Sequence, residues 1–252
     1  MIDTHAHIYT EKYADDRDAI IQRAFEQGVQ KILMPNIDLA SIEGMLSLEE
    51  RYPTQCFSMM GLHPCYVKED YQDQLAVITS NFEERSFIAV GEIGLDFYWD
   101  KTFEKQQYDA FEQQLRLARK YKLPVAIHMR DSIDQTLEVL ADFKDVTGVL
   151  HCFSGNLEQA NKAIDYGFLL GIGGVVTFKK STLPQVIQEI PLSSMLLETD
   201  SPYLAPTPKR GKVNEPAFLS FIAEKIAVIK QVDVSVVIGE TSKNAKQLFQ
   251  LD

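Results

Sequence analysis

The chain has 252 residues, a formal net charge of −11 and a hydrophobic content of 45%. This length is compatible with two small domains or with one α/β barrel, and the apolar content is ordinary for a globular protein with a sizeable core. A strongly acidic chain is not typical of proteins that coat nucleic acid non-specifically, because such binding depends on neutralising phosphates. Any polyanionic substrate must therefore be held by a local group of cations and by bound metal.

The remaining bulk features indicate a reducing compartment. The three cysteines are an odd number and show no paired spacing, as is usual for intracellular proteins. The amino-terminal residues have neither the basic region nor the long apolar stretch of a signal peptide. No apolar run approaches the roughly 20 residues that a membrane span needs. We therefore expect a cytoplasmic protein without membrane segments, and no feature indicates an obligate protein partner.

Short β-rich apolar runs alternate along the chain with longer segments of helical period. Strands are predicted over residues 2–6, 30–35, 56–61, 87–92, 124–128, 147–151, 168–172 and 195–199. Helices are predicted over residues 15–27, 39–51, 70–84, 103–121, 132–143, 157–166 and 183–189, with one or two more between 215 and 250. Repeated β–α units of this length predict a (β/α)8 TIM barrel that forms a single domain over residues 1–252. A doubly wound open sheet is the competing architecture, but the first βα junction lacks the glycine-rich phosphate loop of that fold.

All five histidines lie at or just past the end of a predicted strand. His5 and His7 lie at the end of the first strand, and alternate residues of a strand point the same way, so the two imidazoles can bind one cation together. Asp3 shares their face and is expected to orient one of the rings. His128 and His151 occupy equivalent positions on the fifth and sixth strands. A single histidine at the end of a strand is more often structural than a metal ligand, but the gathering of several at one barrel rim predicts a metal site.

Carboxylates close two of the predicted strands. Glu92 ends the fourth strand within an apolar run, where an acid is costly unless it is paired or coordinates a metal. Asp200 ends the eighth strand and is placed to bind a metal and to accept a proton from attacking water. Glu198 shares its face one layer deeper and is the main competing candidate. Strand alternation turns Cys152 away from His151, so we expect this cysteine to pack in the core.

Together these residues resemble the amidohydrolase-like metal-dependent hydrolases, and among them the TatD-type deoxyribonuclease family. The resemblance runs essentially from end to end of the chain. Its motifs are Asp-Thr-His-Ala-His at 3–7, Gly-Leu-His-Pro at 61–64, Gly-Glu-Ile-Gly-Leu-Asp at 91–96, Leu-Pro-Val-Ala-Ile-His-Met-Arg-Asp at 123–131, His-Cys-Phe-Ser-Gly at 151–155, Glu-Thr-Asp-Ser-Pro-Tyr-Leu-Ala-Pro at 198–206, and Lys-Arg-Gly-Lys followed by Asn-Glu-Pro at 209–216.

The resemblance implies two divalent cations, for which Zn, Mg, Mn and Co are all compatible. One metal would be held by His5, His7 and Glu92. The second would be held by His128 and His151, with Glu92 bridging the two. The resemblance further implies that Asp200 binds the first metal and acts as general base, and that the substrate is DNA.

A further set of side chains is predicted to hold phosphate, namely His63, Arg130, Tyr203, Lys209, Arg210 and Lys212. The last three lie in the irregular stretch 200–214 after the eighth strand. A basic run of this kind is often only solvated surface, but beside a metal site in an acidic protein it favours a phosphate clamp. Tyr203 could also stack on a base. The aromatic run 97–99 consists either of packing residues at the barrel top or of further stacking groups.

Two positions depart from related sequences. Cys65 stands where many members of the family carry histidine, and Glu92 stands where some related hydrolases use a modified lysine, which favours the nuclease branch. We predict a divalent-metal-dependent hydrolase that cleaves phosphodiester bonds in DNA. The alternatives are a lactonase, amidase or aminoacyl-tRNA deacylase on the same metal frame, and a non-catalytic metal-binding barrel. The basic cluster favours the nuclease, because a neutral substrate would not need it.

Overall fold

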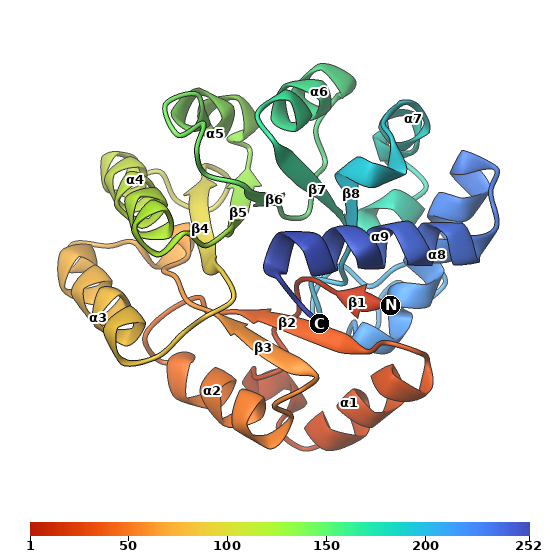
Figure 1. Ribbon diagram of the computed structural model, residues 1–252, viewed down its shortest axis with the longest axis horizontal. Helices are drawn as coiled ribbons and strands as arrows, with labels where there is room; N and C mark the ends of the chain where they lie inside the picture. The colour runs from red at the N-terminus through yellow and green to blue at the C-terminus, as the bar shows by residue number, and fades with distance from the viewer.

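A ring of parallel strands surrounded by helices forms the computed structural model, which describes residues 1–252 (Figure 1). The strands are β1 (Ile2–Asp3), β2 (Lys31–Pro35), β3 (Cys56–Met59), β4 (Val90–Asp96), β5 (Val125–Arg130), β6 (Gly148–Leu150), β7 (Phe168–Ile172) and β8 (Met195–Leu197). The helices are α1 (Arg17–Glu26), α2 (Ile42–Arg51), α3 (Tyr71–Glu84), α4 (Glu104–Tyr121), α5 (Ile133–Leu140), α6 (Leu157–Asp165), α7 (Leu183–Glu189), α8 (Leu219–Lys230) and α9 (Val234–Phe249).

The ring closes through two short seams. Strands β1, β2 and β3 form one parallel ladder, and β4 to β8 form a second one in chain order. The ladders meet where Met60, just after β3, bridges to Val90 at the start of β4. On the other side, Ala6 bridges to Ser201 and so joins the segment after β1 to the segment after β8. The predicted barrel fold is therefore confirmed.

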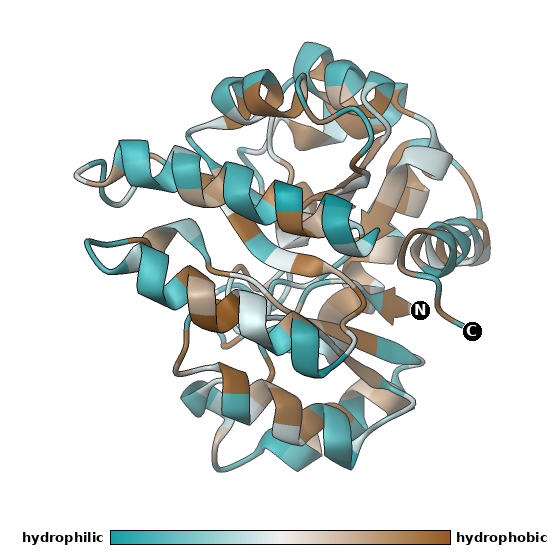
Figure 2. Cartoon of the chain, turned by 60° about the vertical axis from the view of Figure 1, so that its left-hand side comes forward, coloured by the Kyte–Doolittle hydropathy of each residue, from teal (hydrophilic) through white to brown (hydrophobic).

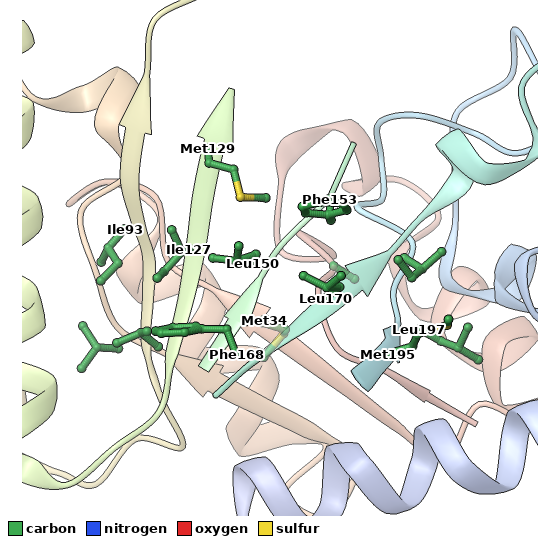
Figure 3. Packing of buried hydrophobic residues seen from close by; sticks show 14 of the residues in the cluster. Met34, Ile93, Ile127, Met129, Leu150, Phe153, Phe168, Leu170, Met195 and Leu197 are labelled. Atoms are coloured by element: carbon green, nitrogen blue, oxygen red, sulfur yellow. The ribbon is translucent and has the colours of Figure 1, made fainter. Parts of the chain in front are cut away.

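Successive residues of the strands supply two separate apolar layers, because their side chains point to opposite faces. One set packs outward against the helices, and Figure 3 shows Ile127, Leu150 and Leu170 of this set side by side on neighbouring strands. The other set forms a small cluster, which consists of Ile2, Leu33, Met59, Ala89, Ala126, Val149 and Leu196 with Ala245 and Phe249 of α9. Strand segments from around the whole ring can meet in one small cluster only inside the barrel.

Helix α9 closes the barrel at the end where the strands begin. Figure 1 shows it lying across the ring beside β1 and β8. The side-chain amide of Asn244 fixes it there by donating to the carbonyls of Leu192 and Met195, both at 2.9 Å. Phe249 adds its ring to the interior apolar layer.

The outer helices are amphipathic, as helices that cover a barrel must be. In α4, the stripe of Phe111, Leu115 and Ala118 on one face is buried. Figure 2 shows hydrophilic and hydrophobic residues alternating along these helices. None of the helices combines the length and the apolar character that crossing a membrane requires.

Strand β4 differs most from its prediction. It runs from Val90 to Asp96 instead of over 87–92, with a shift of register between Val90 and Ile93. The predicted strand ends two residues before Gly94. In the structure Gly94 continues the strand beside β5, where an added Cβ would lie 2.1 Å from the carbonyl oxygen of His128. Glu92 is therefore an internal residue of β4 and not its last one.

Four other strands also end two or more residues from their predicted positions, among them β3, which ends at Met59. β1 stops at Asp3 and β8 at Leu197, both short of the predicted ends, whereas β5 extends to Arg130. At the ends of β1 and β8 the backbone bonds across the closing seam instead of continuing a regular ladder, and the Asp200 N–H donates to the His5 carbonyl at 2.9 Å. Both segments thereby stay adjacent although neither remains a strand.

The closure by α9 can be tested by truncating its buried terminal ring. Phe249→Ala should lower the free energy of unfolding by about 3 kcal/mol, the usual cost of removing a buried aromatic side chain. Val236→Ala, at an exposed position of the same helix, should change it by no more than about 0.5 kcal/mol. Urea denaturation of both variants measures the difference. Equal stability of the two variants would show that α9 does not seal the interior layer.

Candidate metal centre

The polar site lies directly above the interior apolar layer. His128 comes two residues after Ala126, and His151 comes two residues after Val149, so each points into the barrel like its apolar predecessor. The site therefore sits toward the carboxyl ends of the strands, the face at which barrels of this type place their active sites. Regular alternation is thus enough to gather side chains from separate strands.

The carboxylate of Glu92 occupies the middle of the site, with its two oxygens facing different imidazoles. Oε2 lies 3.1 Å from Nε2 of His5 and 3.6 Å from Nε2 of His7. Oε1 lies 3.0 Å from Nδ1 of His128 and 3.5 Å from Nε2 of His63. Burial alone would raise the pKa of Glu92, but the surrounding histidines lower it well below its usual range. The buried carboxylate is therefore ionised.

Asp200 provides a second carboxylate on the His7 side of the site. Its Oδ1 lies 3.6 Å from Nε2 of His7 and 3.7 Å from Nε2 of His151. The same His151 nitrogen lies 3.9 Å from Oε1 of Glu92, so this ring stands between the two carboxylates. Burial would raise the pKa of Asp200, but the contact with His7 and the charge of nearby histidines lower it.

Two of the histidines, His7 and His128, have one ring nitrogen hydrogen-bonded to a protein side chain, and His151 has one in ionic contact with a carboxylate. His7 Nδ1 lies 2.9 Å from the Tyr9 hydroxyl, which itself donates to the Pro35 carbonyl and so must accept from the ring. His128 Nε2 lies 2.7 Å from Asp96, and His151 Nδ1 lies 3.0 Å from Glu198; the His151 and Glu198 atoms form a close ionic contact.

These contacts set the chemistry of the opposite nitrogen. In a neutral imidazole the nitrogen that donates carries the only hydrogen, so the other presents a lone pair. In His7, His128 and His151 that other nitrogen faces Glu92 or Asp200 at 3.0–3.7 Å. Two acceptors cannot hydrogen-bond to each other, so either a proton or a cation must lie between each ring nitrogen and the carboxylate that it faces. The donor set of buried imidazoles and carboxylates fits a divalent metal, and orienting contacts of this kind are typical of metal-binding histidines.

His63 has the reverse arrangement. Its Nδ1 accepts the backbone N–H of Cys65 at 3.1 Å, so the hydrogen of its neutral form lies on Nε2. Burial lowers the pKa of His63, which favours this neutral form. Although the ring lies close to that of His128, its inward nitrogen is a hydrogen-bond donor. This geometry is better suited to binding an oxyanion than to binding a metal.

The pKa values of His5 and His151 move in opposite directions. Burial lowers the pKa of His5 to about 4. Burial would also lower that of His151, but the charges of Glu198, Asp200 and Glu92 raise it to about 10. The two rings stack with their centroids 3.3 Å apart, so a single proton on His151 satisfies the pair when no metal is bound. A metal must displace this proton.

Two acids have roles that the sequence did not reveal. Asp96 contacts His128 and was not among the predicted site residues, although it alternates with Glu92 and Gly94 in the motif at 91–96. Glu198 was considered as a competitor of Asp200, but it lies behind His151 and is fully buried. Gly171 leaves the space that Glu198 occupies, because an added Cβ there would lie 2.1 Å from Glu198 Oε2.

Two expectations about neighbouring residues are corrected. Asp3 does not orient an imidazole, because its carboxylate accepts the backbone N–H of His5 at 3.3 Å and both the N–H and hydroxyl of Thr199, so it ties β1 to the segment after β8. Cys152 is only partly buried, its Sγ lies within 4.8 Å of a His151 nitrogen, and its backbone N–H donates to Glu198. This bond brings the carboxylate of Glu198 toward His151.

The predicted phosphate-binding residues do not all lie near the centre. Arg130 is exposed at the end of β5, with its guanidinium 3.9 Å from the ring centroid of Tyr98. Tyr203 is also exposed, and its ring centroid lies 6.1 Å from that of His7. Lys12 sits over the Tyr203 ring at 4.6 Å. The rim around the metal centre therefore carries paired aromatic and cationic side chains.

The basic cluster 209–212 makes its contacts elsewhere. The Lys209 ammonium lies 5.1 Å from the ring centroid of Phe218, just before α8. The Arg210 guanidinium lies 3.9 Å from the ring centroid of Phe178 and donates to the Ala205 carbonyl at 3.1 Å. Lys212 is exposed. Two members of the cluster thus fasten the loop after β8 to its surroundings, and none of the three contacts the histidines.

The contact between Glu198 and His151 predicts a measurable effect on metal affinity. Glu198→Gln removes the charge that orients the ring, and loss of such a contact typically weakens metal binding by about 10–100-fold. Glu189→Gln, an exposed acid at the end of α7, should bind metal like the unaltered protein. Calorimetric titration of chelator-treated protein with zinc or manganese compares the variants. Unchanged affinity of Glu198→Gln would contradict the orienting role.

Comparisons with known proteins agree with this geometry. The sequence model of the family described as "TatD related DNase" matches residues 2–250. The "Uncharacterized metal-dependent hydrolase YabD" of Bacillus subtilis is 35% identical over 255 residues, which cover 100% of both chains. The "3'-5' ssDNA/RNA exonuclease TatD" of Erwinia tasmaniensis is 32% identical over 259 residues, again covering 100% of both. The crystal structure of YjjV, a TatD homolog from Escherichia coli K12, has a TM-score of 0.94 at 32% identity and covers 100% of this chain and 98% of that chain. The chain therefore belongs to the TatD-related DNase family, a family of metal-dependent hydrolases.

Proposed function

We propose that the protein is a deoxyribonuclease that uses two divalent cations to hydrolyse phosphodiester bonds. The arrangement of Glu92 carries this proposal, because each of its oxygens faces a separate group of imidazoles. Oε2 faces His5 and His7, whereas Oε1 faces His128 and His151. A carboxylate in this position would bridge two cations, and Asp200 would complete the first group. Zn, Mn, Co and Mg all accept such mixed nitrogen and oxygen donors.

The cations would supply Lewis acidity to the scissile phosphate and make water a nucleophile at neutral pH. The protein side chains would do the rest. Asp200 is ionised and slightly exposed, so one of its carboxylate oxygens can accept the proton of attacking water. His63 would donate from Nε2 to a phosphate oxygen. Arg130 would bind a second phosphate, because a guanidinium matches the geometry of that group.

The choice of a nucleic acid rests on the rim of the site and on the relatives. A relative named as a 3'-5' ssDNA/RNA exonuclease matches over the full length of this chain. The exposed guanidinium of Arg130 beside aromatic rings would suit a phosphate chain with stacking bases. A lactone, an amide or another neutral substrate would not require such a rim. Lys209 and Arg210 contribute less to phosphate binding than expected, because their charged groups lie over aromatic rings.

The direct test uses protein freed of metal with a chelator and then supplied with zinc, manganese, cobalt or magnesium. Single- and double-stranded oligodeoxynucleotides, a matching oligoribonucleotide, a lactone and an amide serve as substrates. We expect metal-dependent cleavage of DNA and negligible hydrolysis of the neutral compounds. Turnover of a neutral compound with no cleavage of DNA under any metal would overturn the proposed function.

Removing the proposed general base, Asp200, should lower turnover without affecting the fold. Asp200→Asn should lower the rate constant for DNA cleavage by about 10² or more, the usual scale for loss of a positioned base. Asp165→Asn, at the exposed end of α6, is the matched control and should behave like the unaltered protein. Single-turnover assays at saturating metal measure this. A rate constant within about threefold of the unaltered protein would mean that another group accepts the proton.

Arg130 should contribute to binding through charge. Arg130→Ala should weaken binding of a single-stranded oligonucleotide and reduce the slope of log affinity against log salt by about 0.7, the value for one lost phosphate contact. Lys162→Ala on α6, at the opposite end of the barrel, should leave the slope unchanged. Fluorescence anisotropy at several salt concentrations gives both slopes. Identical slopes for the two variants would exclude a phosphate contact by Arg130.

A further inference from the structure

Exposed aromatic side chains occur in only one region of this protein. Trp99 is 66% exposed, Tyr98 53%, Tyr203 46% and Tyr66 39%, and every other aromatic side chain is at least partly buried. Tyr66 follows β3, Tyr98 and Trp99 follow β4, and Tyr203 follows β8. All four therefore lie on the rim that surrounds the metal centre. Exposed aromatic rings gathered on one face are typical of binding sites and not of random surface.

A cavity of about 300 Å³ opens beside this centre, between the short 3-10 helix η2 (Pro64–Tyr66) and the segment that joins β4 to α4. The rings of Trp99 and Phe103 line one side, and Pro64, Cys65 and Val67 line the other. This volume is at the lower limit of ligand pockets, which run from about 300 to 1,000 Å³. The cavity therefore suits one small planar group better than a large ligand.

Asp96 connects this cavity to the metal centre. Its carboxylate lines the cavity and also contacts His128 at 2.7 Å, and His128 in turn contacts Glu92. On the opposite side, Cys65 lines the cavity and its backbone N–H binds His63. A group in the cavity is thus one residue away from the candidate metal ligand His128 and from His63, the candidate contact of a phosphate oxygen.

The polar groups that line the cavity are already paired. Asp96 accepts the backbone N–H groups of Tyr98 and Trp99, both at 3.0 Å, in addition to its contact with His128. The Gln107 amide binds the backbone of Asp96 and of Asp100. Lys68 pairs with Asp100 at 3.2 Å across the opening. Few polar atoms remain to discriminate hydrogen-bonding patterns, so the cavity would select a flat ring by stacking and not by its substituents.

We propose that this cavity holds one unpaired nucleobase of a single-stranded substrate, next to the scissile phosphate, with Trp99 as the stacking surface. The inference rests on the proposed nuclease function and adds a subsite to it. A base can enter only if it is neither paired nor stacked on its neighbours, so the subsite favours single strands and frayed ends over intact duplex. The same paired polar groups make the subsite tolerant of all four bases.

Trp99 is the only tryptophan of the chain, so its fluorescence reports directly on this cavity. The probe is a single-stranded thymidine hexamer added to the Asp200→Asn protein loaded with the metal that supports turnover. A second set of hexamers carries one abasic tetrahydrofuran residue, moved stepwise along the chain. We expect quenching by the intact hexamer and much weaker quenching when the abasic residue occupies one particular position. Equal quenching by every hexamer would overturn the proposal.

Variants of Trp99 test the same contact by catalysis with Asp200 intact. Trp99→Ala should raise KM for the hexamer by about fivefold or more with a smaller change in kcat, as expected when a base loses an aromatic stacking partner. Trp99→Phe keeps an aromatic ring and should retain most of the affinity. Tyr166→Ala, at the opposite end of the barrel and beside Lys162, is the matched control and should leave KM unchanged.

Measuring the abasic hexamer with the Trp99→Ala variant separates a stacking contact from a structural role of Trp99. If Trp99 stacks on the base, the loss of affinity caused by the abasic residue should largely disappear in Trp99→Ala, because the two changes remove the same interaction. Full additivity of the two losses would overturn the proposal. If the unaltered protein cleaves no hexamer with any metal, the proposed function itself fails and the subsite fails with it. Cleavage without a preference between intact and abasic hexamers refutes the subsite alone.

Discussion

The ionised carboxylate of Glu92, buried among imidazoles, is the constraint on which the rest of the site depends. A buried charge is tolerated only when it is paired or coordinates a metal, and here the oxygens of Glu92 lie 3.0–3.9 Å from imidazole nitrogens. The fold meets this constraint by fixing the far nitrogen of each ring, through the Tyr9 hydroxyl for His7, Asp96 for His128 and Glu198 for His151. Each orienting group comes from a different part of the chain. Much of the polar interior of the barrel thus holds the inward nitrogens of these imidazoles toward the carboxylates of the site.

Much of this arrangement follows from the sequence, because alternation along strands is a local property. Alternation predicts most strand positions and the barrel. It also predicts the convergence of six side chains, namely His5, His7, Glu92, His128, His151 and Asp200. Other features depend on close contact between distant segments. β4 passes closely against β5 at Gly94 and continues to Asp96, beyond the predicted end at residue 92, so the contact of Asp96 with His128 was missed. The donor character of His63 depends on a single backbone N–H and could not be predicted from its position in a motif.

The protein has a net charge of −11, so the binding of a polyanion depends on the rim of the site and not on the surface as a whole. Long-range attraction to phosphate is weak for such a chain, and non-specific coating of DNA is disfavoured. The rim instead offers short-range contacts, in which a cation and a ring act as a pair. Arg130 lies against Tyr98, and Lys12 lies against Tyr203. Stacking depends little on salt, so a rim of this composition keeps contacts with a single strand under conditions where purely ionic binding is screened.

The seam between the beginning and the end of the barrel has a consequence for synthesis. The segment after β1 bonds to the segment after β8, so His5 and Asp200 become neighbours only when almost two hundred intervening residues have been ordered. Contacts of such long sequence separation form late in folding, and domains of this size complete their packing after most of the chain has left the ribosome. A nascent chain that has not reached residue 200 holds part of the imidazole cluster but no complete centre. Hydrolytic capacity is therefore withheld until the barrel has closed, so partial translation products carry no assembled site.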